Sequence, residues 1–331
     1  MAITVAVIGA GSWGTTIASL AADNTPTVLW ARRPELAERI DRDHVNPDYL
    51  PGFGLSSQLR ATASMADAVG SADVLVMAVP SQGYRSIAAE AARHLRAWVP
   101  VVSLTKGLER GTQQRMSEVT RDEMPGHPVA VLTGPNLAKE ILSGQPAASV
   151  VAVDDSDIAH ELQRIFSRPT LRVYTNDDVV GCEVGGVVKN VIAIAAGMSE
   201  GMGFGDNSKA TLITRGLAEI TRLGMALGGS AATFAGLAGM GDLIATCSSH
   251  QSRNHTVGLR LGRGESIDDV IASTNTVAEG VLSSPSVLDL ARRYGVEMPI
   301  TEQVVAVCHE GRTARSALGA LMQRTNKREN D

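Results

Sequence analysis

The first half of the chain alternates short runs of β-branched apolar residues with longer stretches of good helix formers. Buried strands are predicted at 3–8, 27–30, 74–79, 99–104 and 129–132. Helices are predicted between them at 15–23, 34–43, 84–95 and 112–123. Strands at 150–153 and 171–174, with a helix at 160–166, extend the pattern, and 46–55 is predicted to be a loop. This alternation predicts an α/β fold with a Rossmann-type doubly wound sheet.

The pattern changes near residue 178, where stretches rich in Ala, Gly, Leu and Val take over with helical spacing. Helices are predicted at 182–197, 208–227, 233–247, 267–273, 284–293 and 300–310. We therefore expect a dinucleotide-binding domain over 1–180 and an all-α substrate and catalytic domain over 181–331.

Composition narrows the class of protein. The 331 residues are 44% hydrophobic and 20% charged with a net charge of −5, which argues against a nucleic-acid binder or a polybasic membrane patch. No apolar run approaches the length of a membrane span. The cysteines Cys182, Cys247 and Cys308 are odd in number and far apart, so we expect reduced thiols, a cytoplasmic protein and no metal site.

A glycine fingerprint follows the first predicted strand. Gly9, Gly11 and Gly14, with Ser12 and Trp13 between them, form G-x-G-x-x-G at the start of a helix. The glycines allow a tight turn, close approach of a pyrophosphate and close helix packing. A glycine-rich turn that binds nothing is the alternative, and the alternating units that follow favour a dinucleotide site.

The end of the second strand bears on which dinucleotide is bound. NAD-preferring sites place an acidic residue there, whereas this chain has Arg32 and Arg33 and no acid before Glu35. Guanidinium groups bind a 2′-phosphate, so the sequence favours NADPH, with NADH as the other cofactor. The alternative is that both arginines are a solvated helix start.

Two lysines are candidates for a role in catalysis or ligand binding. Lys189 lies inside an apolar helix, flanked on its own face by Gly185, Gly186 and Ala193, which leaves room for a ligand or another backbone. Burial lowers the pKa of a lysine and suits it to proton exchange with a carbonyl or alkoxide oxygen. Snorkelling at a domain interface is the alternative. Lys106 follows the fifth strand, at the sheet edge where α/β folds bind ligands, or it is a surface-loop lysine.

Other polar residues are candidates for substrate contact. Gly134 and Asn136 follow a strand, although a turn before a helix explains them equally well. Asp242 follows two glycines and is a partner for Lys189 or a helix cap. Ser252, Arg253 and Asn254 form either a phosphate or carboxylate clamp or an ordinary polar loop.

Taken in order, these motifs resemble the bacterial NAD(P)H-dependent sn-glycerol-3-phosphate dehydrogenases over nearly the whole chain. The resemblance includes the fingerprint and the Lys189–Asn190 helix, and its other segments are 46–52, 106–108, 134–136, 205–210, 236–243, 252–254 and 279–280. It implies reversible hydride transfer between NAD(P)H and dihydroxyacetone phosphate, which gives sn-glycerol 3-phosphate for glycerophospholipid synthesis. A homodimer is compatible with the apolar helices of the second domain.

The resemblance also implies residue roles. Lys189 is the implied proton donor and acceptor. Implied substrate contacts are Lys106, Gly134, Asn136, Lys189, Asp242, Ser252, Arg253 and Asn254. Implied cofactor contacts, besides the three glycines, are Ser12, Trp13, Arg32, Arg33, Lys106, Ala138, Arg253, Val277 and Glu279. The family usually has Ser where this chain has Asn136, whose amide still forms hydrogen bonds.

Two other functions fit part of the pattern. A lysine-dependent dehydrogenase for a β-hydroxyacid or a ketopantoate-like carboxylate shares the Rossmann domain, the helical second domain and Gly-x-x-x-Lys-Asn at 185–190. It would reduce a keto acid and ignore dihydroxyacetone phosphate. A non-catalytic dinucleotide sensor would bind the cofactor without turnover, and it leaves Lys189 inside its helix unexplained.

Overall fold

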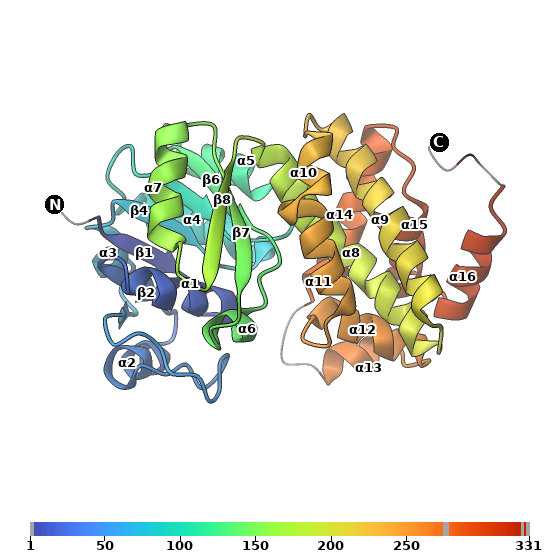
Figure 1. Cartoon of the computed structure of the whole chain (residues 1–331), viewed down its shortest axis with the longest axis horizontal. Helices are drawn as coiled ribbons and strands as arrows, with labels where there is room; N and C mark the ends of the chain where they lie inside the picture. Colours follow the sequence, from blue (N-terminus) through green and yellow to red (C-terminus); the bar gives the residue numbers. More distant parts are fainter. Residues whose placement is uncertain (1–2, 274–277, 326–327, 329–331) are drawn as a thin grey trace.

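The computed structural model describes residues 3–273, 278–325 and 328, and it places an eight-stranded sheet beside a bundle of helices (Figure 1). The strand order is β3-β2-β1-β4-β5-β6-β7-β8. The first six strands run parallel to one another, β7 pairs antiparallel with β6, and β8 is parallel to β7. The order of the first six is that of a dinucleotide-binding sheet. The predicted fold class is confirmed.

The elements of the sheet region follow the sequence pattern closely. The strands are β1 Val5–Ile8, β2 Thr27–Trp30, β3 Arg60–Thr62, β4 Val74–Met77, β5 Val101–Ser103, β6 Val129–Thr133, β7 Ala147–Ala152 and β8 Leu171–Asn176. The helices are α1 Ser12–Ala22, α2 Pro34–Asp43, α3 Met65–Val69, η1 Ser81–Gly83, α4 Tyr84–Ala92, α5 Met116–Glu123, α6 Ala138–Leu142 and α7 Ser156–Phe166.

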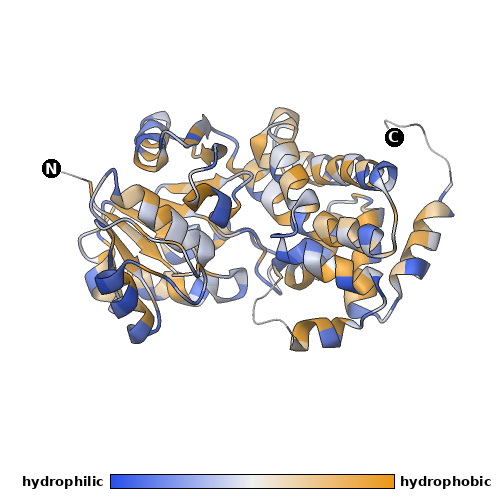
Figure 2. Ribbon diagram, turned by 60° about the horizontal axis from the view of Figure 1, so that its bottom comes forward, coloured by the Kyte–Doolittle hydropathy of each residue, from blue (hydrophilic) through white to orange (hydrophobic). Residues whose placement is uncertain are grey.

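Both faces of the sheet are buried, which explains the continuous apolar runs in its strands. In β1, Val5 and Val7 pack into a core shared with α1 and α7, whereas Ala6 and Ile8 pack on the opposite side against α3 and α4. The ribbon coloured by hydropathy shows apolar strands enclosed between helices (Figure 2). The carboxyl-end loops of the parallel strands are left free to form a site.

The helical region is built around one long helix, α8 Val179–Gly201, which α9, α11, α12 and α14 surround (Figure 1). Its elements are α9 Asp206–Ala226, α10 Ala231–Ala235, the π-helical turn η2 Leu237–Gly241, α11 Asp242–Ser248, α12 Arg253–Gly262, α13 Ile267–Ala272, α14 Glu279–Arg293, α15 Pro299–His309 and α16 Ala314–Met322. By length and composition α8 would pass for a membrane span, but 94% of its apolar window is buried inside the protein. It is a core helix.

Two predicted helices have different bounds in the structure, and the expectation that all strands run parallel was wrong for β7. The helix predicted at 233–247 is three elements, α10, η2 and α11, because Gly236, Gly239 and Gly241 interrupt it. The helix predicted at 112–123 begins only at Met116. The edge strand β3, the helices α3, α6, α12 and α16, and the antiparallel direction of β7 were not predicted. The pattern of apolar residues does not report the direction in which a strand pairs, and β3, α3 and α6 are only three to five residues long.

The boundary predicted at residue 180 stays a prediction, although the secondary structure changes there: β8 ends at Asn176 and α8 begins at Val179. Contacts join the two regions. Glu183 of α8 is buried, and it accepts hydrogen bonds from the Ser117 hydroxyl at 2.5 Å and from Arg115 Nη1 at 2.8 Å. These bonds join α8 to the start of α5 in the sheet region.

Candidate active site

The loops after successive parallel strands bring the predicted sheet residues to one edge. Ile8, Met77 and Ser103 lie side by side at the ends of β1, β4 and β5. Gly9 follows β1 and Lys106 follows β5, so both residues lie at the same edge of the sheet, with β4 between their strands. Lys106 reaches the next loop, where its Nζ donates to the Gly134 carbonyl at 3.0 Å. The structure thus brings together the fingerprint and the two loops that the sequence selected.

The fingerprint turn has the shape that a dinucleotide requires. Gly9 has φ +116°, and a Cβ atom there would lie 2.5 Å from the Ala78 carbonyl oxygen. A Cβ at Gly14 would lie 2.1 Å from the Gly9 carbonyl oxygen. α1 begins directly after Gly11 with no side chain capping it, so its first N–H groups are available for an anion. The turn fits a pyrophosphate.

Lys189 is buried in the middle of α8, with 5% of the residue exposed. Its Nζ donates to Asp242 Oδ1 at 2.5 Å and to Thr246 Oγ1 at 2.7 Å, both on α11. Lys106 Nζ donates to the other oxygen of the same carboxylate, Oδ2, at 2.7 Å. Asp242, at 1% exposed, therefore bridges two ammonium groups, one from each region of the protein.

This environment changes the acidity of Lys189. Burial disfavours the charged form, and it lowers the pKa of Lys189 to about 8 despite the opposing effect of Asp242. The positive charge of Lys106 acts in the same direction as burial. An amine with this pKa exists in both protonation states near neutral pH, which suits a group that donates and accepts protons.

The small residues beside Lys189 serve packing as well as access. A Cβ at Gly185 would lie 2.7 Å from the Ala238 carbonyl oxygen, so the η2 backbone occupies the space beside that glycine. A Cβ at Gly186 would lie 3.2 Å from Thr133 Oγ1 and 3.4 Å from Lys106 Cγ. The space predicted for a ligand or another backbone is thus taken by backbone at Gly185, and Gly186 faces the sheet edge.

A chain of amides connects α8 to α12 and α14. Asn254 Nδ2 donates to Asn190 Oδ1 at 2.9 Å, and Asn254 Oδ1 accepts from the Gly280 N–H at 2.9 Å. Ser252 caps α12 by accepting from the His255 N–H, and the Arg253 side chain that follows is exposed. The triplet 252–254 is therefore the start of a helix beside the Lys189 helix rather than a polar loop.

The remaining predicted residues lie around this centre or outside the described part. Arg32 and Arg33 are exposed after β2, and Ala138 begins α6. Glu279 begins α14, and its carboxylate accepts from the Ser81 N–H at 3.2 Å and from the Ser81 hydroxyl at 2.7 Å. Val277 lies outside the described residues.

Among the buried polar groups near the sheet edge that have no partner in the described part of the chain are two side-chain N–H donors. They are Asn136 Nδ2 and the Nε1 of Trp13. Asn136 is held through its other amide atom, because Oδ1 accepts from Ser149 Oγ at 2.6 Å. Buried donors without acceptors are rare in native structures, and both belong to segments predicted to contact substrate or cofactor.

Sequence reasoning missed two residues of the site. Thr246 contacts Lys189, and its only signal is its position one helical turn after Asp242. Ser81 holds Glu279 across 198 residues of sequence, and nothing in its local pattern indicates that contact.

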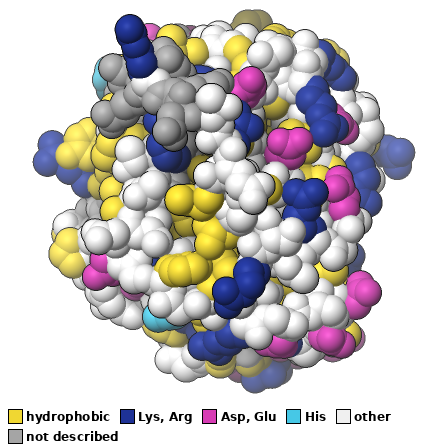
Figure 3. Space-filling view, turned by 90° about the vertical axis from the view of Figure 1, so that its right-hand side faces the viewer, with side chains coloured by type: hydrophobic (Ala, Val, Ile, Leu, Met, Phe, Trp, Pro, Cys, Tyr) yellow, Lys and Arg dark blue, Asp and Glu magenta, His cyan; other side chains and the backbone are white. Residues whose placement is uncertain are grey.

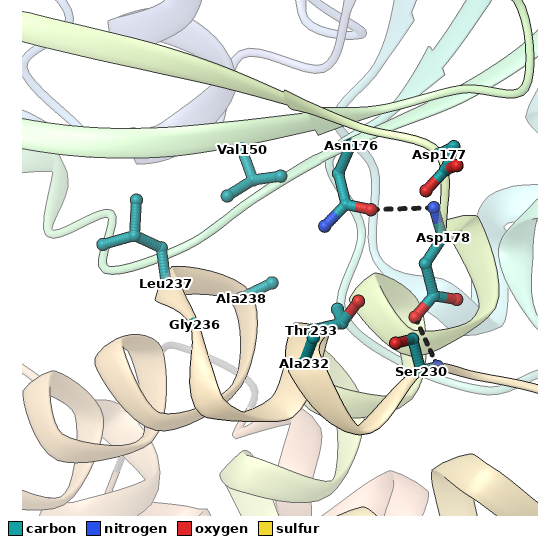
Figure 4. A pocket seen from close by; sticks show the side chains of 10 residues that line it. All are labelled: Val150, Asn176, Asp177, Asp178, Ser230, Ala232, Thr233, Gly236, Leu237 and Ala238. Carbon is teal, nitrogen blue, oxygen red and sulfur yellow. Dashed lines mark hydrogen bonds between the residues drawn. The ribbon is translucent and has the colours of Figure 1, made fainter.

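A cavity among the described residues is lined by none of these side chains. It has a volume of about 220 Å³ between the end of β8 and α10 (Figure 4). Asp178 stands at its wall, where it caps α8 through the Gly181 N–H and accepts from the Ser230 N–H, both at 2.7 Å. No predicted site residue lines it, so we assign it no part in the reaction.

Fold and site together define a class of protein: a nicotinamide-dependent dehydrogenase with a Rossmann-type domain and a helical second domain. Within the described residues no group of three or more His, Cys, Asp or Glu side chains is arranged to hold a metal ion.

Comparison with known proteins identifies the family. Models for the N-terminal and C-terminal parts of NAD-dependent glycerol-3-phosphate dehydrogenase match residues 4–159 and 178–319. Glycerol-3-phosphate dehydrogenase (NAD(P)+) 2 of Sphingopyxis alaskensis is 56% identical over 323 residues, which cover 98% of this chain and 97% of that protein. The Thermobifida fusca glycerol-3-phosphate dehydrogenase (NAD(P)+) is 55% identical, with 98% of each chain covered. The chain belongs to the NAD-dependent glycerol-3-phosphate dehydrogenase family.

Solved structures agree with this assignment. The crystal structure of glycerol-3-phosphate dehydrogenase from Coxiella burnetii matches with a TM-score of 0.93 and 34% identity, and it covers 98% of this chain and 99% of its own. A ketopantoate reductase from Ralstonia eutropha matches with a TM-score of 0.59 and 16% identity, over 96% of this chain and 100% of its own, which is likeness of fold alone. The activity is therefore that of an NAD(P)-dependent glycerol-3-phosphate dehydrogenase, and the coenzyme is NAD(P).

Proposed function

We propose that the protein reduces dihydroxyacetone phosphate to sn-glycerol 3-phosphate with NADPH, and with NADH as the second cofactor, to supply glycerophospholipid synthesis. The observation that carries the proposal is the buried Lys189, held by Asp242 between the sheet edge and the helical region. Arg32 and Arg33, exposed after β2, support the preference for NADPH, because guanidinium groups bind a 2′-phosphate well.

In this proposal Lys189 moves the proton. The nicotinamide, when bound, supplies or accepts the hydride. Lys189, as ammonium, donates a hydrogen bond to the ketone oxygen and gives up its proton as negative charge develops there. In the reverse direction the neutral amine accepts the proton of the alcohol. Asp242 orients Lys189 through the 2.5 Å contact, and Lys106 adds a second positive charge at the sheet edge.

The start of α12 binds the substrate phosphate in the same proposal. Arg253 provides a guanidinium group, and the unbonded N–H groups of a helix start favour an anion. Asn254 links this point to Lys189 through Asn190, so binding of the remote phosphate fixes the position of the reacting carbon. Gly134, Asn136 and Ser252 are the further proposed substrate contacts. The further proposed cofactor contacts are Ser12, Trp13, Ala138, Val277 and Glu279.

A direct assay tests the proposed function. Dihydroxyacetone phosphate is added with NADPH or NADH, and loss of absorbance of the reduced nicotinamide is followed. We expect turnover with both cofactors and a higher kcat/KM with NADPH. Ketopantoate and a β-keto acid, added as the rival substrates, are expected to give none. Reduction of a keto acid without reduction of dihydroxyacetone phosphate would contradict the proposal.

The pKa of Lys189 predicts opposite pH dependences for the two directions. Ketone reduction needs the ammonium form, so its kcat/KM is expected to fall as the pH rises through about 8. Alcohol oxidation needs the neutral amine, so its kcat/KM is expected to rise over the same range. Initial rates in both directions between neutral and alkaline pH check this. Parallel profiles in the two directions would rule out Lys189 as the titrating group.

The same proposal includes the compartment and the oligomeric state of the enzyme. It works in the cytoplasm on a small phosphorylated substrate, and two copies pair through the helical region. The apolar side chains of Met225, Met240 and Ile244 are exposed there and support such pairing. Hydrophobic side chains also gather on the end of the helical region that faces the viewer in Figure 3.

A further inference from the structure

The loop between α2 and β3 is folded back onto the fingerprint turn. It closes on itself through the Leu55 N–H, which donates to the His44 carbonyl at 2.9 Å, and through the bridge between Val45 and Gly54. Asn46, fully buried, anchors it to the fingerprint turn, because its Nδ2 donates to the Ala10 carbonyl at 2.9 Å. The loop therefore has a defined position beside the nucleotide site.

Further contacts fix the middle of this loop. Asn46 Nδ2 also donates to Thr15 Oγ1 at 2.8 Å, and Asn46 Oδ1 accepts from the Tyr49 N–H at 3.2 Å. The Ser12 hydroxyl of the fingerprint donates to the Tyr49 carbonyl at 3.1 Å. Asp48, which lies between these anchored residues, is thereby held near the end of β2.

Asp48 forms an ion pair with Arg33. The Arg33 side chain is 53% exposed and the Asp48 side chain 41% exposed, so both are accessible to a ligand. Arg32, next to this pair, is also exposed. The segment after β2 lacks the acidic residue of an NAD site, and the returning loop places a carboxylate in contact with Arg33 of that segment.

We propose that Asp48 sets the selectivity between NADH and NADPH, an inference that rests on the proposed function. With NADH, the carboxylate accepts a hydrogen bond from the ribose 2′-hydroxyl while it stays paired with Arg33. With NADPH, Arg33 pairs with the 2′-phosphate in place of Asp48. The free Asp48 carboxylate then repels the phosphate. Exposed ion pairs are weak, so the exchange is easy and both cofactors are accepted.

The test is Asp48→Asn, which removes the charge and keeps the size of the side chain. Dissociation constants for NADPH and NADH are measured by titration calorimetry, without turnover. We expect the ratio of NADPH to NADH affinity to rise by about tenfold, mainly through tighter NADPH binding, and the gain to shrink with added salt. Glu38→Gln is the matched control, because Glu38 is an exposed acid on α2 that pairs with Arg42, and its ratio is expected to stay unchanged.

A double mutant distinguishes the effect of the Asp48–Arg33 ion pair from the general effect of removing a negative charge. In an Arg33→Gln background, Asp48→Asn is expected to have a much smaller effect on NADPH binding than in the wild type. An unchanged ratio in Asp48→Asn, an equal loss of both cofactors, or an equal shift in Glu38→Gln would overturn the inference. Failure of the wild type to reduce dihydroxyacetone phosphate would refute the proposed function instead, since the binding ratios are measured without substrate.

Discussion

Replacement of Lys189 with alanine is expected to lower kcat for ketone reduction by about a hundred- to ten-thousand-fold, the usual contribution of a positioned general acid. The protein should stay folded, because Asp242 keeps Lys106 as its partner. Binding of NADPH is expected to be unchanged, since no contact of Lys189 reaches the fingerprint turn. Steady-state kinetics and calorimetric titration of NADPH measure the two effects separately.

Chemical rescue distinguishes a lost proton donor from a damaged site. The alanine variant leaves a space where the ammonium was, and methylamine in the buffer is expected to restore part of the rate in proportion to its concentration. An equal amount of a quaternary ammonium salt, which carries no proton, serves as the control. Near-normal turnover of Lys189→Ala without added amine would refute the assigned role.

Replacement of Asp242 with asparagine is expected to have the second largest effect, because it leaves two ammonium groups facing each other without their shared carboxylate. Loss of one partner from a buried ion pair costs about 3–5 kcal/mol of unfolding free energy. The pKa of Lys189 is expected to fall below its value of about 8, because the charge that opposes the effect of burial is gone. Denaturant unfolding measures the first effect.

The pH profile of ketone reduction measures the change in the pKa of Lys189 in Asp242→Asn. Its descending limb is expected to move to lower pH in Asp242→Asn, because reduction needs the ammonium form of Lys189. Thr246→Val removes a neutral hydroxyl from the same amine and is the control, with a much smaller movement of the limb expected. If Asp242→Asn kept the wild-type limb, the proposed coupling of Asp242 to Lys189 would be wrong.

The sheet and the fingerprint were predictable because their signals are local. Gly9 adopts a positive φ and Gly14 packs against the Gly9 carbonyl within the same turn, and the strand runs are apolar because both sheet faces are covered. Lys189 was identified because a charge inside an apolar helix conflicts with its surroundings. Where glycines break the 3.6-residue period, as in η2, the prediction of one continuous helix failed.

The contacts that complete the site were not predictable in this way. Asp48 reaches Arg33 only because Asn46 fixes a loop against the fingerprint turn, and Glu279 meets Ser81 from the other end of the chain. Such pairs depend on how distant segments pack, which neither periodicity nor spacing encodes. The sequence therefore gives the candidate donors and acceptors, and the fold decides which of them meet.

The most direct test of the central claim is a crystal structure of the enzyme with NADPH and a non-reducible analogue of dihydroxyacetone phosphate. The account predicts Lys189 Nζ within hydrogen-bond distance, about 2.6–3.2 Å, of the oxygen that replaces the ketone, with Asp242 still bound to the amine. An analogue oxygen bound only by Lys106, with Lys189 still enclosed by Asp242 and Thr246, would contradict it.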